Sequence, residues 1–461
     1  MGYLTGSASR ISDAPPAMLV RRAGIVPTLV VIGLGFLIPE PTVFAWRRAF
    51  IPALIAWGLT ASVIALLAGY GSVGTLSATG LALVVWQDAK PLIDKPLIDR
   101  PWIDQKEVLG RAGPDFVDIG RHFIVGYDDG DNIRELVRTG GVGGIFVTTR
   151  NVVGRKASDI AVQIARLQEI RREAGLPPLV VTADQEGGPV SRLSPPLPYP
   201  PPLSRIAALP PEQRREAARQ VGVDQGAALR KIGVTMDLAP VSDLMPARPW
   251  IVDWNTQIVT RSISRDPDVV ATVAAGFSEG LLAAGITPTA KHFPGLGRVA
   301  VDTHLFSASL NVAEADLEAT DWIPFRAVLS IPGAAVMLSH VALAEVDAGI
   351  PASQSKRIVT GLLREQWGFD GIAITDDLTM GPVQRVGMCK AVERALNAGI
   401  DLLLVSWDAD KMYPALRCAL DASDARRLDD EMLKRSAQRL DRFERIDTQP
   451  PSIEGRRAAS R

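Results

Sequence analysis

The feature that most constrains the fold of this chain is a series of eight short apolar segments, which alternate with helix-like stretches from about residue 107 onward. Alternating strands and helices predict an α/β fold, and eight such pairs are typical of a TIM (β/α)8 barrel. The main alternative is an open, doubly wound sheet, but no G-x-G-x-x-G phosphate loop indicates one. We therefore expect a barrel. Its expected strands are 123–126, 143–148, 179–183, 235–238, 287–290, 335–338, 372–375 and 402–405, with helices that include 159–173, 212–232 and 268–284.

The first 89 residues have a different composition from the rest. Residues 49–87 contain no charged side chain, and residues 24–46 contain only Glu40. About 20 mainly apolar residues can cross a bilayer as a helix. We therefore expect a membrane-embedded N-terminal region of two to three helices in residues 1–89, with the lipid bilayer as a partner. A cleaved signal peptide is the weaker alternative, because it has a single short apolar core.

Charges beside the apolar segments bear on orientation. Arg10, Arg21 and Arg22 precede the first segment and favour a cytoplasmic N-terminus, whereas Arg47 and Arg48 follow it and argue the other way. Three crossings would place the barrel outside the cytoplasm and two would place it inside. We expect an integral protein of the cytoplasmic membrane whose barrel lies on the extracytoplasmic side.

A five-residue repeat, KPLID-KPLID-RPWID, fills most of residues 90–106. Proline at every fifth position predicts an extended, semi-stiff spacer. The alternative is a segment that packs on the barrel through Leu92, Leu97 and Trp102. We expect the barrel domain to occupy residues 107–445 and a polar tail to occupy residues 446–461.

Charge and cysteine content limit the possible partners. The net charge of −1 gives no indication of a nucleic-acid partner. Cys389 and Cys418 are the only cysteines, so we expect neither a disulfide framework nor a thiolate metal site. No metal and no cofactor are expected.

Two distant motifs carry the chemistry. The first, KHFPGLGRVAVDTH, places Asp302 and His304 two residues apart on a loop rich in glycine and proline. A carboxylate beside an imidazole orients the ring and stabilises its charged form, which suits proton transfer. An isolated D-x-H is more often a solvated loop. The second motif, ITDDLTM, overturns that interpretation, because it puts Asp376 at the end of an expected strand.

These motifs resemble those of glycoside hydrolase family 3, specifically its bacterial β-N-acetylglucosaminidase branch. The family pattern runs K-H-F-P-G-H-G, D-[ST]-H, then G-F-D-G with S-D-D-L-x-M. This chain has KHFPGLG, DTH and GFDGIAITDDLTM in the same order, together with ADQEGGPVSR, APVSDL and RSISRDP. The resemblance covers residues 184–406.

The resemblance implies catalytic roles at the carboxyl ends of the strands, where TIM barrels place their active sites. It implies that Asp376 is the nucleophile of a retaining glycosidase and that His304, held by Asp302 on a mobile loop, is the acid/base. Gly295 and Gly297 could act as hinges of that loop. We expect the neighbouring Asp377 to turn away and cap the next helix.

The same resemblance implies a carbohydrate substrate, namely terminal β-linked N-acetylglucosamine on oligosaccharides or cell-wall muropeptides. The residues expected to bind the sugar and its acetamido group are Asp184, Arg192, Arg261, Lys291 and His292.

Several positions depart from the family pattern. Leu296 replaces a histidine, Pro189 replaces an arginine, and R-S-F-G becomes RSIS, ending at Ser264. The segment LFSASL also lacks the usual polar continuation after the pair of Asp302 and His304.

These changes leave open another sugar specificity, or phosphorolysis in place of hydrolysis. An inactive membrane-bound sugar-binding protein is a further alternative, although the retained catalytic residues argue against it. A family 3 β-glucosidase would lack the D-[ST]-H loop.

Overall fold

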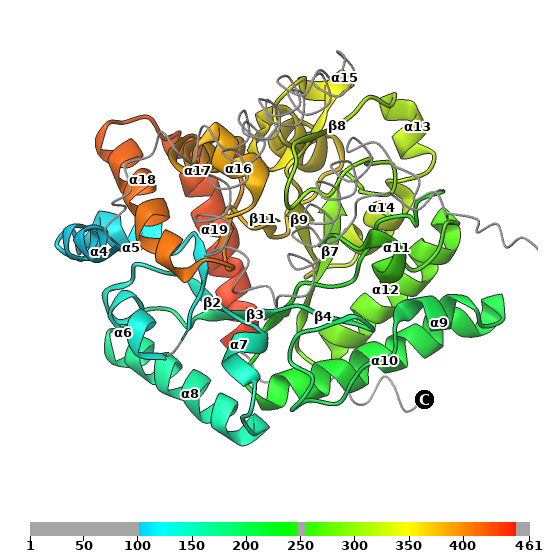
Figure 1. Cartoon of the computed structure of the whole chain (residues 1–461), viewed down its shortest axis with the longest axis horizontal. Coiled ribbons are helices and arrows are strands. Elements are labelled where there is room, and N and C mark those ends of the chain that lie inside the picture. Colours follow the sequence, from blue (N-terminus) through cyan, green and yellow to red (C-terminus); the bar gives the residue numbers. More distant parts are fainter. Residues whose placement is uncertain (1–100, 129, 248–254, 449–461) are drawn as a thin grey trace, which may run out of the picture. The chain divides into compact units, whose positions relative to one another are not determined.

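The computed structural model of the chain describes residues 101–128, 130–247 and 255–448. In these ranges one sheet of eight parallel strands has the order β11-β9-β7-β6-β3-β2-β1-β12 (Figure 1). The order follows the chain and its two ends meet, since Thr375 N donates to Leu402 O at 3.0 Å. The expected TIM-like barrel is therefore confirmed in a nearly closed form. Its strands are β1 (Phe123–Gly126), β2 (Gly144–Val147), β3 (Val180–Ala183), β6 (Met236–Asp237), β7 (Thr287–Phe293), β9 (Ala335–Leu338), β11 (Ala373–Thr375) and β12 (Leu403–Val405).

All eight expected strands are present, with small differences in length. The largest difference is in β7, which continues three residues past the expected end and so includes Lys291 and His292. Two small additional sheets lie outside the barrel sheet. Their strands are β4 (Gln185–Gly187) with β5 (Val190–Ser191), and β8 (Ala308–Leu310) with β10 (Val341–Leu343).

Helices surround the strands (Figure 1). The three helices expected from the sequence are confirmed as α8, α10 and α12, each within two residues of its expected start. The helices are α4 (Pro101–Leu109), α5 (Pro114–Gly120), α6 (Gly130–Thr139), α7 (Thr149–Val152), α8 (Ala157–Glu173), α9 (Leu203–Ala207), α10 (Pro211–Lys231), α11 (Ile258–Arg261), α12 (Pro267–Ala283), α13 (Glu314–Glu318), α14 (Ile323–Leu329), α15 (Ala344–Asp347), η1 (Ala352–Gln354), η2 (Arg357–Gln366), α16 (Gly381–Val386), α17 (Met388–Ala398), η3 (Ala409–Lys411), α18 (Met412–Asp424) and α19 (Asp430–Thr448).

Apolar side chains of the strands alternate between two packed layers. In β1, Phe123 and Val125 join the large cluster that contacts the helices, whereas Ile124 joins a second cluster with residues of the other strands. This two-residue period is what a pleated strand imposes, and it fills the barrel interior with side chains. Leu440 of α19 is buried in the second cluster, so the last helix packs against the barrel core.

A buried carboxylate fastens α19 to the amino-terminal end of the barrel. Asp401, just before β12, accepts hydrogen bonds from Ser436 Oγ at 2.7 Å and from Arg439 Nε at 2.8 Å. It also pairs with Arg364 of η2 at 2.7 Å. Because an unpaired buried charge would be costly, these partners fix the helices to this end and leave the opposite, carboxyl end of the strands for the site.

The expectation that two cysteines give no disulfide framework overlooked one bond. Cys389 of α17 and Cys418 of α18 form a disulfide, with their Cα atoms 4.7 Å apart. They are 29 residues apart in the sequence and become neighbours only because the two helices pack side by side. Cysteine spacing alone does not reveal such a pair.

The expected extended spacer is also wrong for its last residues, because α4 begins at Pro101. Proline suits the first turn of a helix, where its missing N–H is not needed. Val108 of this helix is fully buried. The rest of the spacer, the expected membrane helices and the polar tail from residue 449 lie outside the described residues. Among the helices that the structure describes, none is long and apolar enough to span a bilayer.

Candidate active site

Polar side chains collect where the barrel strands end at their carboxyl side. Asp184 directly follows β3, His340 lies two residues past β9, and Asp376 directly follows β11. Lys291 and His292 occupy the last part of β7. Parallel strands bring these termini to one face, which is where TIM barrels hold their catalytic groups. Of the four histidines, only His122 lies away from this face, at the start of β1.

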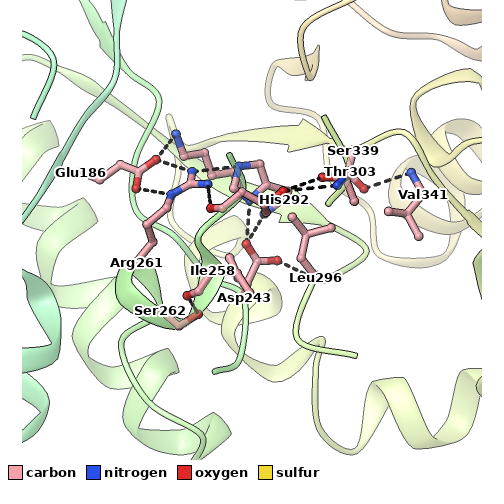
Figure 2. A network of polar contacts seen from close by, with 12 residues as sticks. Glu186, Asp243, Ile258, Arg261, Ser262, His292, Leu296, Thr303, Ser339 and Val341 are labelled. Carbon is pink, nitrogen blue, oxygen red and sulfur yellow. Dashed lines mark hydrogen bonds and ion pairs between the residues drawn. The ribbon is translucent and has the colours of Figure 1, made fainter. Parts of the chain in front are cut away.

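A buried ion network joins three of the expected sugar-binding residues, and Figure 2 shows its Glu186–Arg261 pair. Lys291 Nζ lies 2.7 Å from Asp184 Oδ1 and 2.6 Å from Glu186 Oε1. Arg261 binds Glu186 with two hydrogen bonds, of 2.9 and 2.6 Å. Burial opposes ionisation of Glu186, but the charges of Arg261 and Lys291 outweigh it and hold the pKa of this carboxyl well below its usual range. Glu186 therefore stays anionic and fixes both cations.

His292 extends this network through both ring nitrogens (Figure 2). Its Nε2 lies 3.2 Å from Arg261 Nη2, and its Nδ1 lies 2.7 Å from Asp243 Oδ2. Arginine can only donate, so Nε2 accepts and Nδ1 carries the hydrogen that Asp243 receives. Asp243 also accepts from the backbone N–H of Leu296 at 2.7 Å. The family's histidine is replaced at this position, but the contact is made by the backbone and does not depend on the side chain.

Arg192 lies beside this network without joining it. Its backbone N–H donates to Asp184 O at 3.0 Å, which sets the loop after β5 next to β3. Its half-buried side chain makes no hydrogen bond or ion pair with another described residue. A guanidinium that no other described residue binds can bind a ligand oxygen.

Asp302 and His304 form the expected pair. The buried Asp302 lies with Oδ1 3.3 Å from Nδ1 of His304, whose side chain is 40% exposed. Asp302 also accepts from the backbone N–H of His304 at 3.0 Å and from that of Asn255 at 2.7 Å. Burial alone would raise the pKa of Asp302, but these hydrogen bonds lower it to about 2. The carboxylate is thus anionic beside an accessible imidazole.

The loop that carries this pair is attached to α16. Gly381 N donates to His304 O at 2.8 Å, and Arg385 Nη2 donates to Leu305 O at 2.7 Å. Gly295, at the start of the loop, has a φ of +114°, which favours glycine. Because α16 follows β11 after a short turn, these contacts hold His304 on the same side as Asp376.

The two adjacent aspartates have different environments. Asp377 accepts from Ser406 Oγ at 2.6 Å, Trp407 N at 2.8 Å and Thr379 N at 2.8 Å. It turns away as expected, but the expected helix cap is wrong, because α16 begins without a side-chain cap. Asp377 instead joins the ends of β11 and β12, and its oxygens are occupied.

Asp376 keeps its carboxylate available. Its Oδ1 accepts a hydrogen bond from the backbone N–H of Asp377 at 2.8 Å. Burial alone would raise its pKa, but nearby histidines, with His292 the largest contributor, outweigh burial and hold that pKa below its usual value. The other two contributors are His340 and His304. An ionised carboxylate among imidazoles suits attack on an electrophilic carbon.

Sequence reasoning did not assign roles to three residues of this site: Glu186, Asp243 and Thr256. Glu186 stands two residues after Asp184 within ADQEGG, and Asp243 follows the fourth expected strand, so strand-end position could have identified both. Thr256 contacts the pair of Asp302 and His304 from another loop, and no local signal could have identified it.

An ionised strand-end carboxylate, a histidine–aspartate pair and a cluster of hydrogen-bonding charges in a (β/α)8 barrel define a glycosidase. The family described as "Glycosyl hydrolase family 3 N terminal domain" matches residues 117–443. The chain belongs to glycosyl hydrolase family 3.

Relatives and solved structures agree with this assignment. The beta-hexosaminidase of Tolumonas auensis is 36% identical over 275 residues, which cover 59% of this chain and 77% of that protein. The beta-hexosaminidase LpqI of Mycobacterium tuberculosis is 34% identical, covering 64% of this chain and 73% of that one. The structure of a family 3 β-N-acetylglucosaminidase from Paenibacillus sp. FPU-7 matches with a TM-score of 0.67 at 30% identity, over 74% of this chain and 65% of that one.

Proposed function

We propose that this glycosidase releases terminal β-linked N-acetylhexosamine, chiefly N-acetylglucosamine, from oligosaccharides or cell-wall muropeptides by a retaining mechanism. The relatives named beta-hexosaminidase support the sugar, and the arrangement of Asp376 with the His304–Asp302 pair supports the mechanism. The observation that carries the proposal is the contrast between Asp377, whose oxygens are occupied, and Asp376, whose carboxylate is ionised and available.

In the first step, an Asp376 oxygen attacks the anomeric carbon as the bond to the leaving oxygen breaks. The Nε2–H of protonated His304 gives its proton to that oxygen, so the aglycone departs as an alcohol. In the second step, neutral His304 takes a proton from water, whose oxygen attacks the anomeric carbon and frees Asp376. Two inversions at one carbon give retention. Asp302 stays anionic throughout and stabilises the imidazolium.

The sugar is held by the charged network beside these groups. Asp184 can accept hydrogen bonds from two neighbouring hydroxyls, while Lys291, Arg261 and Arg192 supply donors and His292 holds Arg261 in place. Glu186 and Asp243 orient Lys291, Arg261 and His292, so few side chains need to be ordered when the substrate binds. This preorganisation favours a polar ligand over an apolar one.

A comparison of aryl β-N-acetylglucosaminide with the matching aryl β-glucoside tests the sugar. We expect kcat/KM to favour the acetamido sugar by at least about tenfold, since it makes contacts that the glucoside lacks. Equal or reversed preference would contradict the proposed specificity. Repeating the assay with inorganic phosphate distinguishes hydrolysis from phosphorolysis, because a sugar 1-phosphate product would establish the latter.

We also propose that residues 1–89 anchor the enzyme in the cytoplasmic membrane and that the barrel works on the extracytoplasmic side. The uncharged residues 49–87 support the anchor. The disulfide between Cys389 and Cys418 supports the side, because disulfides persist in oxidising compartments. Cell fractionation, followed by protease treatment of intact spheroplasts, tests both parts: a barrel protected from protease would contradict the proposed side.

A further inference from the structure

The hydroxyl of Thr256 lies at a junction beside the His304–Asp302 pair. Its Oγ1 is 3.1 Å from Asp302 Oδ1 and 3.2 Å from His304 Nδ1. It is also 3.3 Å from both the backbone N and the Oγ1 of Thr303. The Thr256 residue is buried, so water does not compete freely for these contacts. A single hydroxyl therefore bridges the carboxylate and the imidazole.

The number of available hydrogens determines which group donates in each of these hydrogen bonds. An ionised carboxylate can only accept, so the one hydroxyl hydrogen of Thr256 points to Asp302. Because this hydrogen is used, Thr256 Oγ1 can only accept from His304, and the hydrogen between the two side chains belongs to Nδ1. Asp302 Oδ1, 3.3 Å from the same nitrogen, can likewise only accept from it. Both neighbours therefore select the Nδ1–H tautomer of neutral His304.

We propose that Thr256 is a positioning residue for acid/base catalysis, which fixes the tautomer and ring orientation of His304 by sharing its Nδ1 hydrogen with Asp302. This inference rests on the proposed role of His304. With Nδ1 committed to hydrogen-bond donation, Nε2 is the nitrogen that gains and loses the catalytic proton. The side chain of His304 is 40% exposed, whereas Asp302 is fully buried, so the exchanging nitrogen has access to substrate and water.

The same residue links proton transfer to sugar binding. The carbonyl oxygen of Thr256 accepts from Arg261 Nη1 at 2.7 Å, and Arg261 in turn binds Glu186. The backbone of Thr256 is thus tied to the sugar-binding network while its hydroxyl is tied to the acid/base pair. This arrangement keeps the His304 ring in a constant position relative to the bound sugar.

Three variants test the hydroxyl with minimal change of volume. Thr256→Val keeps the side-chain shape but removes the bridge, and Thr256→Ser keeps the bridge. Thr289→Val is the matched control, because it removes a buried hydroxyl on β7 that lies outside the junction of Thr256, Asp302 and His304. Each variant is assayed on diacetylchitobiose, which needs a proton on its leaving oxygen, and on a dinitrophenyl β-N-acetylglucosaminide, which does not.

We expect Thr256→Val to lower kcat/KM on diacetylchitobiose by at least about tenfold and on the dinitrophenyl substrate by less than about twofold. Thr256→Ser and Thr289→Val should stay within about threefold of wild type on both. An equal loss on the two substrates, or a Thr256→Val enzyme as active as wild type, would overturn the inference. A purely structural role would lower both activities together.

Two further measurements separate the possible failures. If His304→Ala lowers kcat/KM much more on diacetylchitobiose than on the dinitrophenyl substrate and Thr256→Val does not, only the role of Thr256 is wrong. If His304→Ala lowers kcat/KM equally on the two substrates, the acid/base assignment and this inference both fail. Nitrogen NMR of wild-type enzyme with the His304 ring neutral covers the case in which Thr256→Val does not fold: hydrogen on Nδ1 supports the inference, and hydrogen on Nε2 overturns it.

Discussion

Adjacent residues of one type can have opposite roles when the backbone presents them to different surroundings. Asp376 and Asp377 follow the same strand, yet Asp377 is occupied by donors from the end of β12 and Asp376 is not. Hydrogen bonds that satisfy a carboxylate reduce its basicity and its freedom to attack. At the residue scale, the availability of its oxygens is the reason for proposing Asp376 rather than Asp377 as the nucleophile.

The role of His304 predicts a dependence on the leaving group. His304→Ala should lower kcat/KM on natural disaccharides by about 10²-fold or more, because general acid catalysis contributes that much. The first step with a dinitrophenyl leaving group should be nearly unaffected, since that group departs without a proton. Burst kinetics with both substrates measure this difference. A comparable loss on the two substrates would indicate that His304 only positions the sugar.

At the scale of elements, the barrel could be predicted from the sequence because the pattern of a short apolar run followed by a helix is local and repeats eight times. Each strand is a short apolar run, and each is followed by a helix, so errors at single boundaries did not change the count. The strand-end rule then located Asp184, Lys291 and Asp376 on one face. Contacts between residues far apart in the sequence could not be predicted in this way. Thr256 and Asp302 are 46 residues apart, and the cysteine pair depends on how α17 packs on α18.

The ion network on β4 and β7 predicts a pH-dependent contribution to stability. The folded-state pKa of Glu186 is lower than its ordinary value of 4.5, so the ionised carboxylate stabilises the fold above about pH 4.5. That contribution is lost as the pH falls below this value. Glu186→Gln should therefore lower the free energy of unfolding at pH 7 by about 3 kcal/mol, because it leaves two buried cations short of a charge.

Chemical denaturation at several pH values measures this effect. The difference between wild type and Glu186→Gln should shrink as the pH falls below 4.5. Glu216→Gln is the matched control, since it removes an exposed ion pair with Arg219 on α10 and should change stability very little. A difference between wild type and Glu186→Gln that stays constant with pH would rule out the proposed ionic role of Glu186.

The disulfide predicts a second effect on stability. It closes a loop of about 30 residues between α17 and α18, and cross-links of this size stabilise a fold by about 3 kcal/mol. The double variant Cys389→Ser, Cys418→Ser should lose that amount and keep its kcat, because neither residue contacts the site. Urea unfolding with and without dithiothreitol checks this. If the free energy of unfolding of the wild type is the same with and without dithiothreitol, the disulfide does not contribute to stability.

At the scale of the whole molecule, the proposed catalytic residues all fall within the 117–443 family match. The first described helix, α4, starts at Pro101 and contributes the buried Val108, so it belongs with the barrel although it begins before residue 107. An apolar region followed by a spacer would let such an enzyme reach polymeric substrate while attached to a membrane.

Separating the two parts tests this organisation. The fragment of residues 101–461 should be soluble and retain kcat/KM within about twofold, because the sugar-binding and catalytic contacts described lie inside it, whereas the full chain should sediment with membranes. Sedimentation and activity assays on both proteins check this. An insoluble or inactive fragment would show that the first 100 residues are required for folding of the barrel.

The central claim is that Asp376 forms a covalent bond with the sugar, and mass spectrometry of the trapped intermediate tests it most directly. A fluorinated N-acetylglucosaminyl fluoride should glycosylate Asp376 quickly, with loss of fluoride from the anomeric carbon, and the glycosyl-enzyme should be hydrolysed slowly. We predict an added mass of one sugar on the peptide that contains Asp376, and no adduct on Asp376→Ala, whose kcat should fall by several orders of magnitude. An adduct on another residue, or turnover of the reagent without an adduct, would contradict the mechanism.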